Sequence, residues 1–309
     1  MKGLFQDKVG GIWKDSQHYA PVDKEFQLTL SEGNTPEAEF AGIIFKREDL
    51  NPTGSIKDRG MAYQISKAYQ EGHQALVISS SGNAAISAAS YCQLVGIKLK
   101  VFASLKINRE KLFKIKELGA EVEISKKAVS EAERFSKGKN IMNLRPSVEK
   151  FGSEGYKSLA FELDRHLGKI DSLFVPVSSG TGFSGIGEGY RELGYLPMMF
   201  AVQTSAVCPI ASQFDTDYVP SPTSLADALV ARVTARREEV LTLIHDSGGG
   251  AFVVDDKLIS KGWEQLEGFG ITTSGEGAAA LAGILKAKGM NKNLGEKVVC
   301  LLTGRKYSS

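Results

Sequence analysis

The stretch Ser172-Leu-Phe-Val-Pro-Val-Ser-Ser-Gly-Thr-Gly-Phe-Ser-Gly185 joins an apolar run to a glycine-rich loop, and the loop opens a predicted helix. A short apolar run bounded by turn residues is typical of a β-strand. A helix that follows such a strand directly is typical of a parallel sheet. This strand–loop–helix unit therefore predicts an α/β fold.

The same alternation of strand and helix patterns extends along most of the chain. The predicted strands are Gly42–Phe45, Ala75–Ser79, Leu99–Ala103, Glu121–Ile124, Ser172–Val177, Met199–Gln203, Ala251–Val254 and Val298–Leu302. The predicted helices include Ile56–Glu71, Ala84–Leu94, Arg109–Leu118 and Gly155–Leu167. Such alternation predicts open, mostly parallel twisted sheets flanked by helices. We expect the strands up to Ile124 to form one sheet and those after Ser172 another.

The composition is that of an ordinary globular protein. The 309 residues are 42% hydrophobic and 24% charged, and the formal net charge is +2. A charge this small argues against binding to nucleic acid or to a membrane surface. The basic residues between 97 and 140 are interleaved with apolar ones, which is typical of a solvated face rather than a nucleic-acid site. No apolar run approaches the length of a membrane span.

The three cysteines, Cys92, Cys208 and Cys300, are far apart and show no metal-ligand spacing. We expect each to be a buried free thiol, and we expect no metal site. The polar start of the chain is unlike a signal peptide. These features predict a protein of the reducing cytoplasm.

The segment Asn51-Pro-Thr-Gly-Ser-Ile-Lys-Asp-Arg-Gly60 is a turn that leads into a predicted helix. Ser55 is the expected N-cap, with Asp58 at the acidic position of a capping box. Lys57 then lies in the first helical turn, where a cation faces the positive end of the helix dipole at a cost of about 0.3–1 kcal/mol. A lysine that has to be neutral to form a Schiff base gains from this position. The alternative is a solvent-facing lysine that tolerates the dipole.

Two further loops follow predicted strands, where parallel sheets bind their ligands. Ser79-Ser-Ser-Gly-Asn83 opens a helix of small residues, and its hydroxyls and amide predict a cradle for a carboxylate. An ordinary N-cap is the alternative. Ser178 to Gly185 is a glycine-rich loop of the kind that binds phosphate.

The glycine-rich loop also matches the dinucleotide pattern GxGxxG at Gly180, Gly182 and Gly185. A dinucleotide site requires an acidic residue after the next strand, which holds the ribose. That strand ends in Val202-Gln-Thr-Ser205 and has no acid. The loop is therefore interpreted as a site for a single phosphate. Thr303, which follows the last predicted strand, is a fourth candidate, although a lone threonine there is more often structural.

Several other segments share a distinctive pattern: Gly10–Trp13, Leu30–Pro36, Glu154–Glu162, Asp246–Gly249, Glu276–Ala282 and Leu302–Gly304. Together with the Lys57, Asn83 and Gly180 segments, they resemble the fold-type II pyridoxal phosphate (PLP) enzymes, a tryptophan synthase beta-like family. Within that superfamily the chain looks most like the threonine synthases. The resemblance covers nearly the whole chain, and the segment around Lys57 is its most specific part.

The resemblance implies a role for each candidate residue. Lys57 would carry the cofactor pyridoxal 5'-phosphate as a Schiff base and shuttle protons on the substrate. The implied cofactor-binding residues are Lys57, Asn83, Ser179, Gly180, Thr181, Gly182, Phe183 and Thr303. Ser80, Ser81, Gly82, Asn83 and Ala84 would hold the substrate carboxylate, and Asn143, Arg145 and Lys150 would hold a substrate phosphate.

The resemblance also implies the organisation and the reaction. A smaller α/β domain would span 45–145, a larger one would combine 1–44 with 146–309, and Lys57 would lie at their interface in a homodimer. The implied activity is threonine synthase, which converts O-phospho-L-homoserine and water to L-threonine and phosphate. The Thr303 hydroxyl cannot keep the pyridine nitrogen protonated as an aspartate would, which suits elimination and replacement.

Some positions depart from the threonine synthase pattern. Leu144 follows Asn143 where a serine is expected, and Ala84 stands where threonine is common. Gly180-Thr-Gly182 looks more like cysteine synthases, and Ser224–Leu229 is similar to hydroxyamino-acid ammonia-lyases. A serine/threonine ammonia-lyase, or another PLP-dependent amino-acid synthase such as cysteine synthase, is therefore the alternative activity. A catalytically idle paralogue that binds PLP or a partner protein is a third possibility, without positive support.

Overall fold

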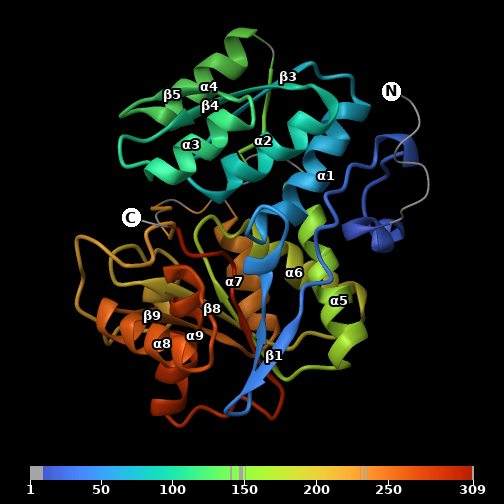
Figure 1. The fold of residues 1–309 in the computed structure, drawn as a ribbon. Helices are drawn as coiled ribbons and strands as arrows, with labels where there is room; N and C mark the ends of the chain where they lie inside the picture. The colour runs from blue at the N-terminus through green and yellow to red at the C-terminus, as the bar shows by residue number, and fades with distance from the viewer. Residues whose placement is uncertain are drawn as a thin grey trace.

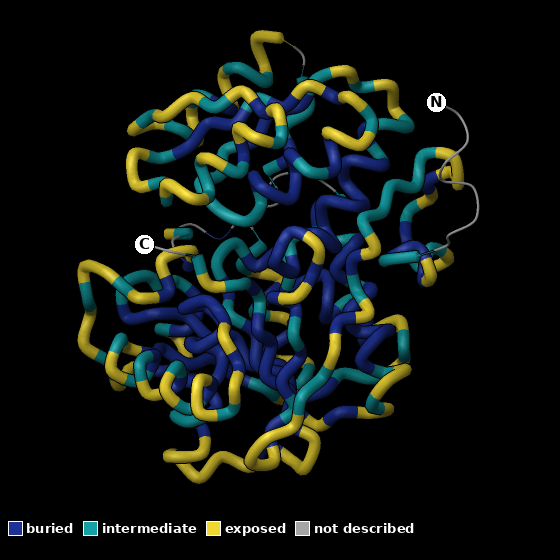
Figure 2. Tube along the Cα trace, in the orientation of Figure 1, coloured by how far each residue is buried: buried dark blue, intermediate teal, exposed yellow. Residues whose placement is uncertain are grey.

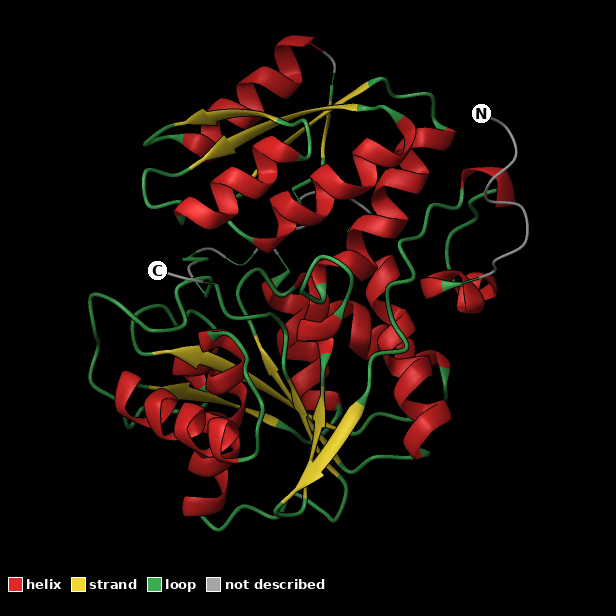
Figure 3. Ribbon diagram, in the orientation of Figure 1, coloured by secondary structure: helices red, strands yellow, loops and turns green. Residues whose placement is uncertain are grey.

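The computed structural model describes residues 10–139, 141–145, 149, 151–229, 231–232, 234 and 236–307. Two sheets form its framework, and helices cover both faces of each sheet (Figure 1; Figure 3). All strand pairs are parallel except one pair at the edge of the larger sheet. The predicted α/β fold with two mostly parallel sheets is confirmed.

The larger sheet has the strand order β1-β2-β10-β7-β8-β9. Its strands are β1 Glu37–Phe40, β2 Ile43–Lys46, β10 Val298–Leu301, β7 Ser172–Pro176, β8 Met198–Thr204 and β9 Gly250–Val254. Side chains alternate between two cores, because successive residues of a strand point to opposite faces. Leu173 and Val175 pack with helices α5 Lys157–Leu167, α6 Thr181–Glu192 and α7 Arg237–Asp246. Phe174 packs on the other face with α8 Asp256–Gly268 and α9 Gly275–Gly289.

The smaller sheet has the order β5-β4-β3-β6. Its strands are β5 Glu121–Ile124, β4 Lys98–Ala103, β3 Ala75–Ser79 and β6 Met142–Asn143. Leu76 and Ile78 point to one face and pack with α1 Lys57–Gln70, α2 Asn83–Val95 and α3 Arg109–Glu117. Val77 and Phe102 point to the other face, which α4 Ala128–Lys139 covers. Helix α1 lies where the two lobes meet (Figure 1).

The chain enters the larger sheet, leaves it for the smaller one, and then returns. Strand β2 crosses the predicted domain boundary at residue 45 and pairs along its length with β10 of the larger sheet. The division into 45–145 and the remainder stays a prediction. Short 3-10 helices lie at Gly11–His18, Lys24–Phe26, Glu48–Leu50, Glu154–Tyr156 and Ala211–Gln213.

Burial is greatest in the inner strands of the two sheets and in helices α1, α6 and α9 (Figure 2). Cys92 and Cys300 are buried free thiols as expected, whereas Cys208 is free but only partly buried, because it lies in a surface turn after β8. Within the described ranges, none of the helices is both long enough and apolar enough to cross a membrane.

Candidate active site

Lys57 is the first residue of α1, and the end of strand β10 holds the turn before it. The Ile56 N–H donates to the Thr303 carbonyl at 3.0 Å, and the Arg305 N–H donates to the Gly54 carbonyl at 2.9 Å. Ser55 and Gly304 form an isolated antiparallel bridge between these two segments. Residues almost 250 positions apart in the chain therefore meet at the start of one helix.

The capping box expected at this helix start is absent, which corrects that expectation. The Ser55 hydroxyl accepts a hydrogen bond from the Lys57 N–H at 3.3 Å. The Asp58 carboxylate turns the other way and accepts hydrogen bonds from the Thr53 N–H at 2.7 Å and from the Ser87 hydroxyl at 2.6 Å. Burial raises the pKa of Asp58 to about 6, against the lowering effect of these hydrogen bonds. Asp58 thus connects the turn at Thr53 to α1 and to α2 through hydrogen bonds.

The Lys57 amine lies beside an aromatic ring and near one carboxylate. Its Nζ is 5.8 Å from the centre of the Tyr156 ring. Burial lowers the pKa of Lys57, and the negative charge of Glu276 on α9 partly opposes this effect. Glu276 is itself buried and accepts a hydrogen bond from the Ala228 N–H at 2.9 Å. This setting favours the neutral amine that a Schiff base requires.

We predict that Glu276→Gln lowers the pKa of Lys57 further, because it removes the charge that stabilises the ammonium form. The acid limb of the kcat profile should then move to lower pH, because the Lys57 amine is free once substrate is bound and its neutral form then persists to lower pH. Steady-state kinetics across a pH series measure this shift. Glu264→Gln, at an exposed position of α8, is the matched control and should leave the limb in place. A shift to higher pH in Glu276→Gln would contradict the assignment.

The glycine-rich loop lies between β7 and α6. Gly180 has a left-handed φ of +86°, and a Cβ on it would approach the Val240 side chain to 2.9 Å, so a larger residue would be strained. No side chain of the described residues caps α6, which begins at Thr181, and the first N–H groups of a helix have no partner within it. The buried Ser184 hydroxyl in the first turn also has no hydrogen-bond partner in the described part of the chain. The loop thus presents free donors to an anion.

Tyr156 connects this loop to Lys57. A Cβ on Gly182 would lie 3.6 Å from the Tyr156 ring, and a Cβ on Gly60, in α1, would lie 2.6 Å from it. One ring therefore packs against the anion-binding loop and against the helix that carries Lys57. On its far side the loop is held by the Ala231 N–H, which donates to the Ser178 hydroxyl at 3.3 Å.

The turn after β3 lies against the end of β10. Asn83 is the first residue of α2, and among described residues no side chain caps this helix. The Asn83 Nδ2 atom lies 2.8 Å from where a Cβ on Gly304 would be, next to Thr303. The buried Asn83 Oδ1 atom has no hydrogen-bond partner among the residues described. The first N–H groups of α2, at Asn83 and Ala84, are thus available to a carboxylate.

The serines of this turn are used in different ways. Ser81 Oγ accepts a hydrogen bond from the Ser104 N–H at 2.6 Å and donates to Ser104 Oγ at 3.0 Å. Ser80 Oγ accepts from the Gly82 N–H at 3.3 Å. The Ser81 hydroxyl therefore stabilises the loop, and a ligand at this turn would meet mainly backbone donors.

The residues predicted to hold a second phosphate are only partly brought together. Asn143 ends β6 beside β3, and its Oδ1 accepts a hydrogen bond from the Arg145 N–H at 3.0 Å. The pKa of Glu133 on α4 is lowered mainly by its hydrogen bond to Lys137, with a smaller contribution from the positive charge of Arg145. Lys150 lies outside the described residues.

An α/β framework, a lysine of lowered pKa at a helix start and a helix N-terminus open to phosphate are together the features of a PLP-dependent enzyme. A family model described as "Pyridoxal-phosphate dependent enzyme" matches residues 28–304, and the chain belongs to this family. The residues fit the cofactor, since the start of α6 and the buried Ser184 hydroxyl have no partners among the described residues, and the Asn83 Nδ2 donor lies beside Gly304.

The most similar curated relatives include threonine synthases. The chain is 31% identical to that of Synechocystis sp. over 95% of this chain and 82% of the relative. It is 30% identical to that of Halalkalibacterium halodurans, with 95% and 88% covered, and 29% identical to that of Methanocaldococcus jannaschii, with 95% and 80% covered.

The solved structure of maize serine racemase matches with a TM-score of 0.80 at 19% identity, over 97% of this chain and 95% of that one. A tomato threonine deaminase matches with a TM-score of 0.74 at 20% identity, over 86% and 75%. These two structural matches show that the fold is shared.

Two residues of the site were not singled out from the sequence as functional. Tyr156 and Glu276 both lie in segments that carry the family resemblance, but their place beside Lys57 follows only from the packing of the 154–156 turn and of α9. The clearest sequence signal was Glu276 itself, an acid between two glycines at the start of an alanine-rich helix.

Proposed function

We propose that this chain is a threonine synthase, which converts O-phospho-L-homoserine and water to L-threonine and phosphate. The observation that carries the proposal is the identity of 29–31% with three threonine synthases along 95% of the chain. Such an enzyme is a carbon–oxygen lyase. The position of Lys57, with its pKa lowered by burial, supplies the amine that this chemistry requires.

The proposed roles of the binding residues are those that the family resemblance implies, and two open helix starts support them. Ser179, Gly180, Thr181, Gly182 and Phe183 would bind the cofactor phosphate at the start of α6. Asn83 would bind the phenolic oxygen, and Thr303 would face the pyridine nitrogen. Ser80, Ser81, Gly82, Asn83 and Ala84 would hold the substrate carboxylate at the start of α2.

Bound PLP would supply the sink for the negative charge that develops on the substrate. The neutral Lys57 amine would remove the Cα proton and, once that proton has left it, a Cβ proton, and it would later return protons to Cγ and Cα. Phosphate would leave from Cγ, and water would add at Cβ. The N–H groups of α2 would keep the substrate carboxylate fixed while Lys57 moves the protons.

The direct test is to incubate the purified protein with PLP and O-phospho-L-homoserine and to measure phosphate and threonine. Release of both in equal amounts is expected. The absence of any turnover of this substrate, in a protein that shows the near-visible band of bound PLP, would contradict the proposal.

The binding of the substrate phosphate gives a sharper prediction. If Asn143 and Arg145 hold it, Arg145→Ala should raise KM for O-phosphohomoserine by about tenfold or more, because one charge-assisted hydrogen bond to a dianion is lost. Cofactor binding should be unchanged. Arg134→Ala, at an exposed position of α4, is the control for loss of positive charge on this lobe. An unchanged KM in Arg145→Ala would exclude the residue from the phosphate site.

A serine/threonine ammonia-lyase is the second candidate, because Ser224–Leu229 is similar to the corresponding segment of hydroxyamino-acid ammonia-lyases. Production of a 2-oxo acid and ammonia from threonine or serine would support this activity. A cysteine synthase would instead form cysteine in the presence of sulfide.

We also propose that the enzyme is a cytoplasmic homodimer, as its family resemblance implies. Analytical ultracentrifugation tests the dimer, and fractionation of cells tests the compartment. A monomer at all protein concentrations would contradict the assembly.

A further inference from the structure

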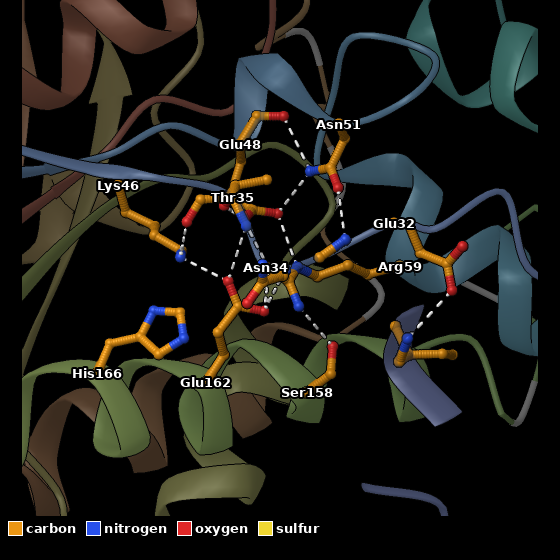
Figure 4. A network of polar contacts seen from close by, with 12 residues as sticks. Glu32, Asn34, Thr35, Lys46, Glu48, Asn51, Arg59, Ser158, Glu162 and His166 are labelled. Carbon is orange, nitrogen blue, oxygen red and sulfur yellow. Dashed lines mark hydrogen bonds and ion pairs between the residues drawn. The ribbon is translucent and has the colours of Figure 1, made fainter. Parts of the chain in front are cut away.

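Four charged side chains are buried together where α1, β2 and α5 meet (Figure 4). Lys46, Glu48 and Arg59 have no exposed surface, and Glu162 is 3% exposed. Lys46 donates to Glu162 Oε1, to Glu37 Oε1 and to the Thr35 carbonyl, each at 2.5 Å. The two cations are thus joined through the carboxylate of Glu162.

Arg59 connects α1 to the neighbouring segments through four hydrogen bonds. Its Nε and Nη2 atoms donate to the two oxygens of Glu48 at 2.7 and 2.8 Å. Nη2 also donates to Glu162 Oε2 at 2.9 Å, and Nη1 donates to Ser158 Oγ at 2.9 Å. Although burial raises it, the charges of Arg59 and Lys46 bring the pKa of Glu162 down to about 2. The planar guanidinium therefore bridges the 3-10 helix Glu48–Leu50 and α5 in one fixed geometry.

Stability alone is a weak reason for such a network. Removing charges from water costs several kcal/mol for each ion, and well-packed apolar residues of similar volume are often as stabilising or more so. A buried charge network does, however, fix the relative position of the elements that it joins, because each bond has strict distance and direction.

Arg59 joins α1, which carries Lys57, to the segment that carries Tyr156. Arg59 lies two residues after Lys57 on α1, and its partner Ser158 lies two residues after Tyr156. A Cβ on Gly155 would overlap the Arg59 carbonyl oxygen, so the two backbones are in direct contact. The Tyr156 ring then lies 5.8 Å from the Lys57 amine.

We propose that Arg59 is a positioning residue for Lys57. Its bonds to Glu48, Glu162 and Ser158 hold the first turn of α1 against the 154–158 segment, and this keeps the Lys57 amine at the face of Tyr156. The inference rests on the proposed role of Lys57 as the cofactor-bearing residue, and not on which amino acid is the substrate.

Lys46 provides the matched control within the same network. It is a fully buried cation bonded to the same Glu162, but it makes no hydrogen bond to α1. Lys46→Met should therefore lower stability without changing Lys57. Glu37→Gln, which removes one Lys46 partner at a partly exposed position, serves the same purpose if Lys46→Met does not fold.

The test compares Arg59→Lys with Lys46→Met in the full chain. PLP uptake is measured from its near-visible band as a function of pH. This uptake depends on the protonation of Lys57 and does not require a substrate. In Arg59→Lys a loosened α1 admits water to Lys57, its pKa rises towards the ordinary value, and half-maximal uptake should move to higher pH. Glu276, the charged group that acts on Lys57, and the Tyr156 ring beside the amine are unchanged in both variants.

Kinetics on a substrate that the enzyme turns over complete the test. Arg59→Lys should lower kcat by about 10- to 100-fold with KM changed only a few-fold, since a small misplacement of a reacting group has this effect. Lys46→Met should lower the Tm and leave both the uptake midpoint and kcat near those of the unsubstituted protein. Equal behaviour of the two variants, or an unchanged midpoint in Arg59→Lys, would overturn the proposal. Failure of the protein on O-phosphohomoserine alone would contradict the proposed function and leave the uptake result valid.

Discussion

Lys57→Ala is expected to abolish both the near-visible absorption of the bound cofactor and all turnover. The amine is the only group at this helix start that can link to PLP, and its acid–base role alone is worth about 10²–10⁴-fold in rate. Absorption spectroscopy of the protein with PLP, followed by a substrate assay, measures both losses.

The control for this substitution is on the same helix. Lys67→Ala removes a lysine that forms a surface pair with Glu71 at 3.6 Å, and it should leave the band and the turnover intact. A band that persists in Lys57→Ala would show that another group carries the cofactor, and the assignment of this site would fail.

Gly155→Ala is expected to be the most destabilising small substitution near the site. The added Cβ would overlap the carbonyl oxygen of Arg59, and backbone on both sides prevents either atom from moving freely. Overpacking of this kind costs about 1–3 kcal/mol, and a contact with backbone belongs at the upper end. Chemical denaturation measures the loss, and weaker PLP uptake should accompany it because Tyr156 is the next residue.

The matched control is Gly138→Ala. Gly138 lies near the end of α4, and a Cβ there would meet no atom within 4 Å. Alanine should stabilise this helix by roughly 0.5–1 kcal/mol, because glycine has more conformational entropy to lose. If Gly155→Ala were as well tolerated as Gly138→Ala, the backbone contact between α1 and the 154–156 turn would be wrong.

The sequence was sufficient for the fold class because the strand pattern is strong where strands are buried. The runs at Ala75–Ser79 and Ser172–Val177 are apolar and directly followed by turn residues, and both are strands in the structure. Strands β1 and β6 were not predicted, since one has the polar sequence Glu37–Phe40 at a sheet edge and the other has only two residues. Pairing with neighbours, rather than local pattern, makes these segments strands.

The candidate site residues were predictable where a few neighbouring positions in the sequence determine the local backbone structure. Lys57, Asn83 and Gly180 each stand at a helix start, and a turn with the right residues can be read from a few neighbouring positions. The bonds of Asp58 were not predictable, because its carboxylate reaches Ser87 on another helix instead of capping its own. Glu162 and Arg59 are about 100 residues apart, and nothing in either segment indicates that they pair.

The central place of β10 in the larger sheet sets the order in which the molecule can be completed. This strand lies between β2 and β7, yet it follows every other described strand along the chain. The smaller sheet, built from 75–143, is continuous in the chain and can form while synthesis continues. The larger sheet stays divided until Val298–Leu301 enters the gap, a late closure over a long loop. Since Thr303 and Gly304 follow that strand and hold the turn at Ile56, a nascent chain has no finished cofactor site until residues 298–304 are in place.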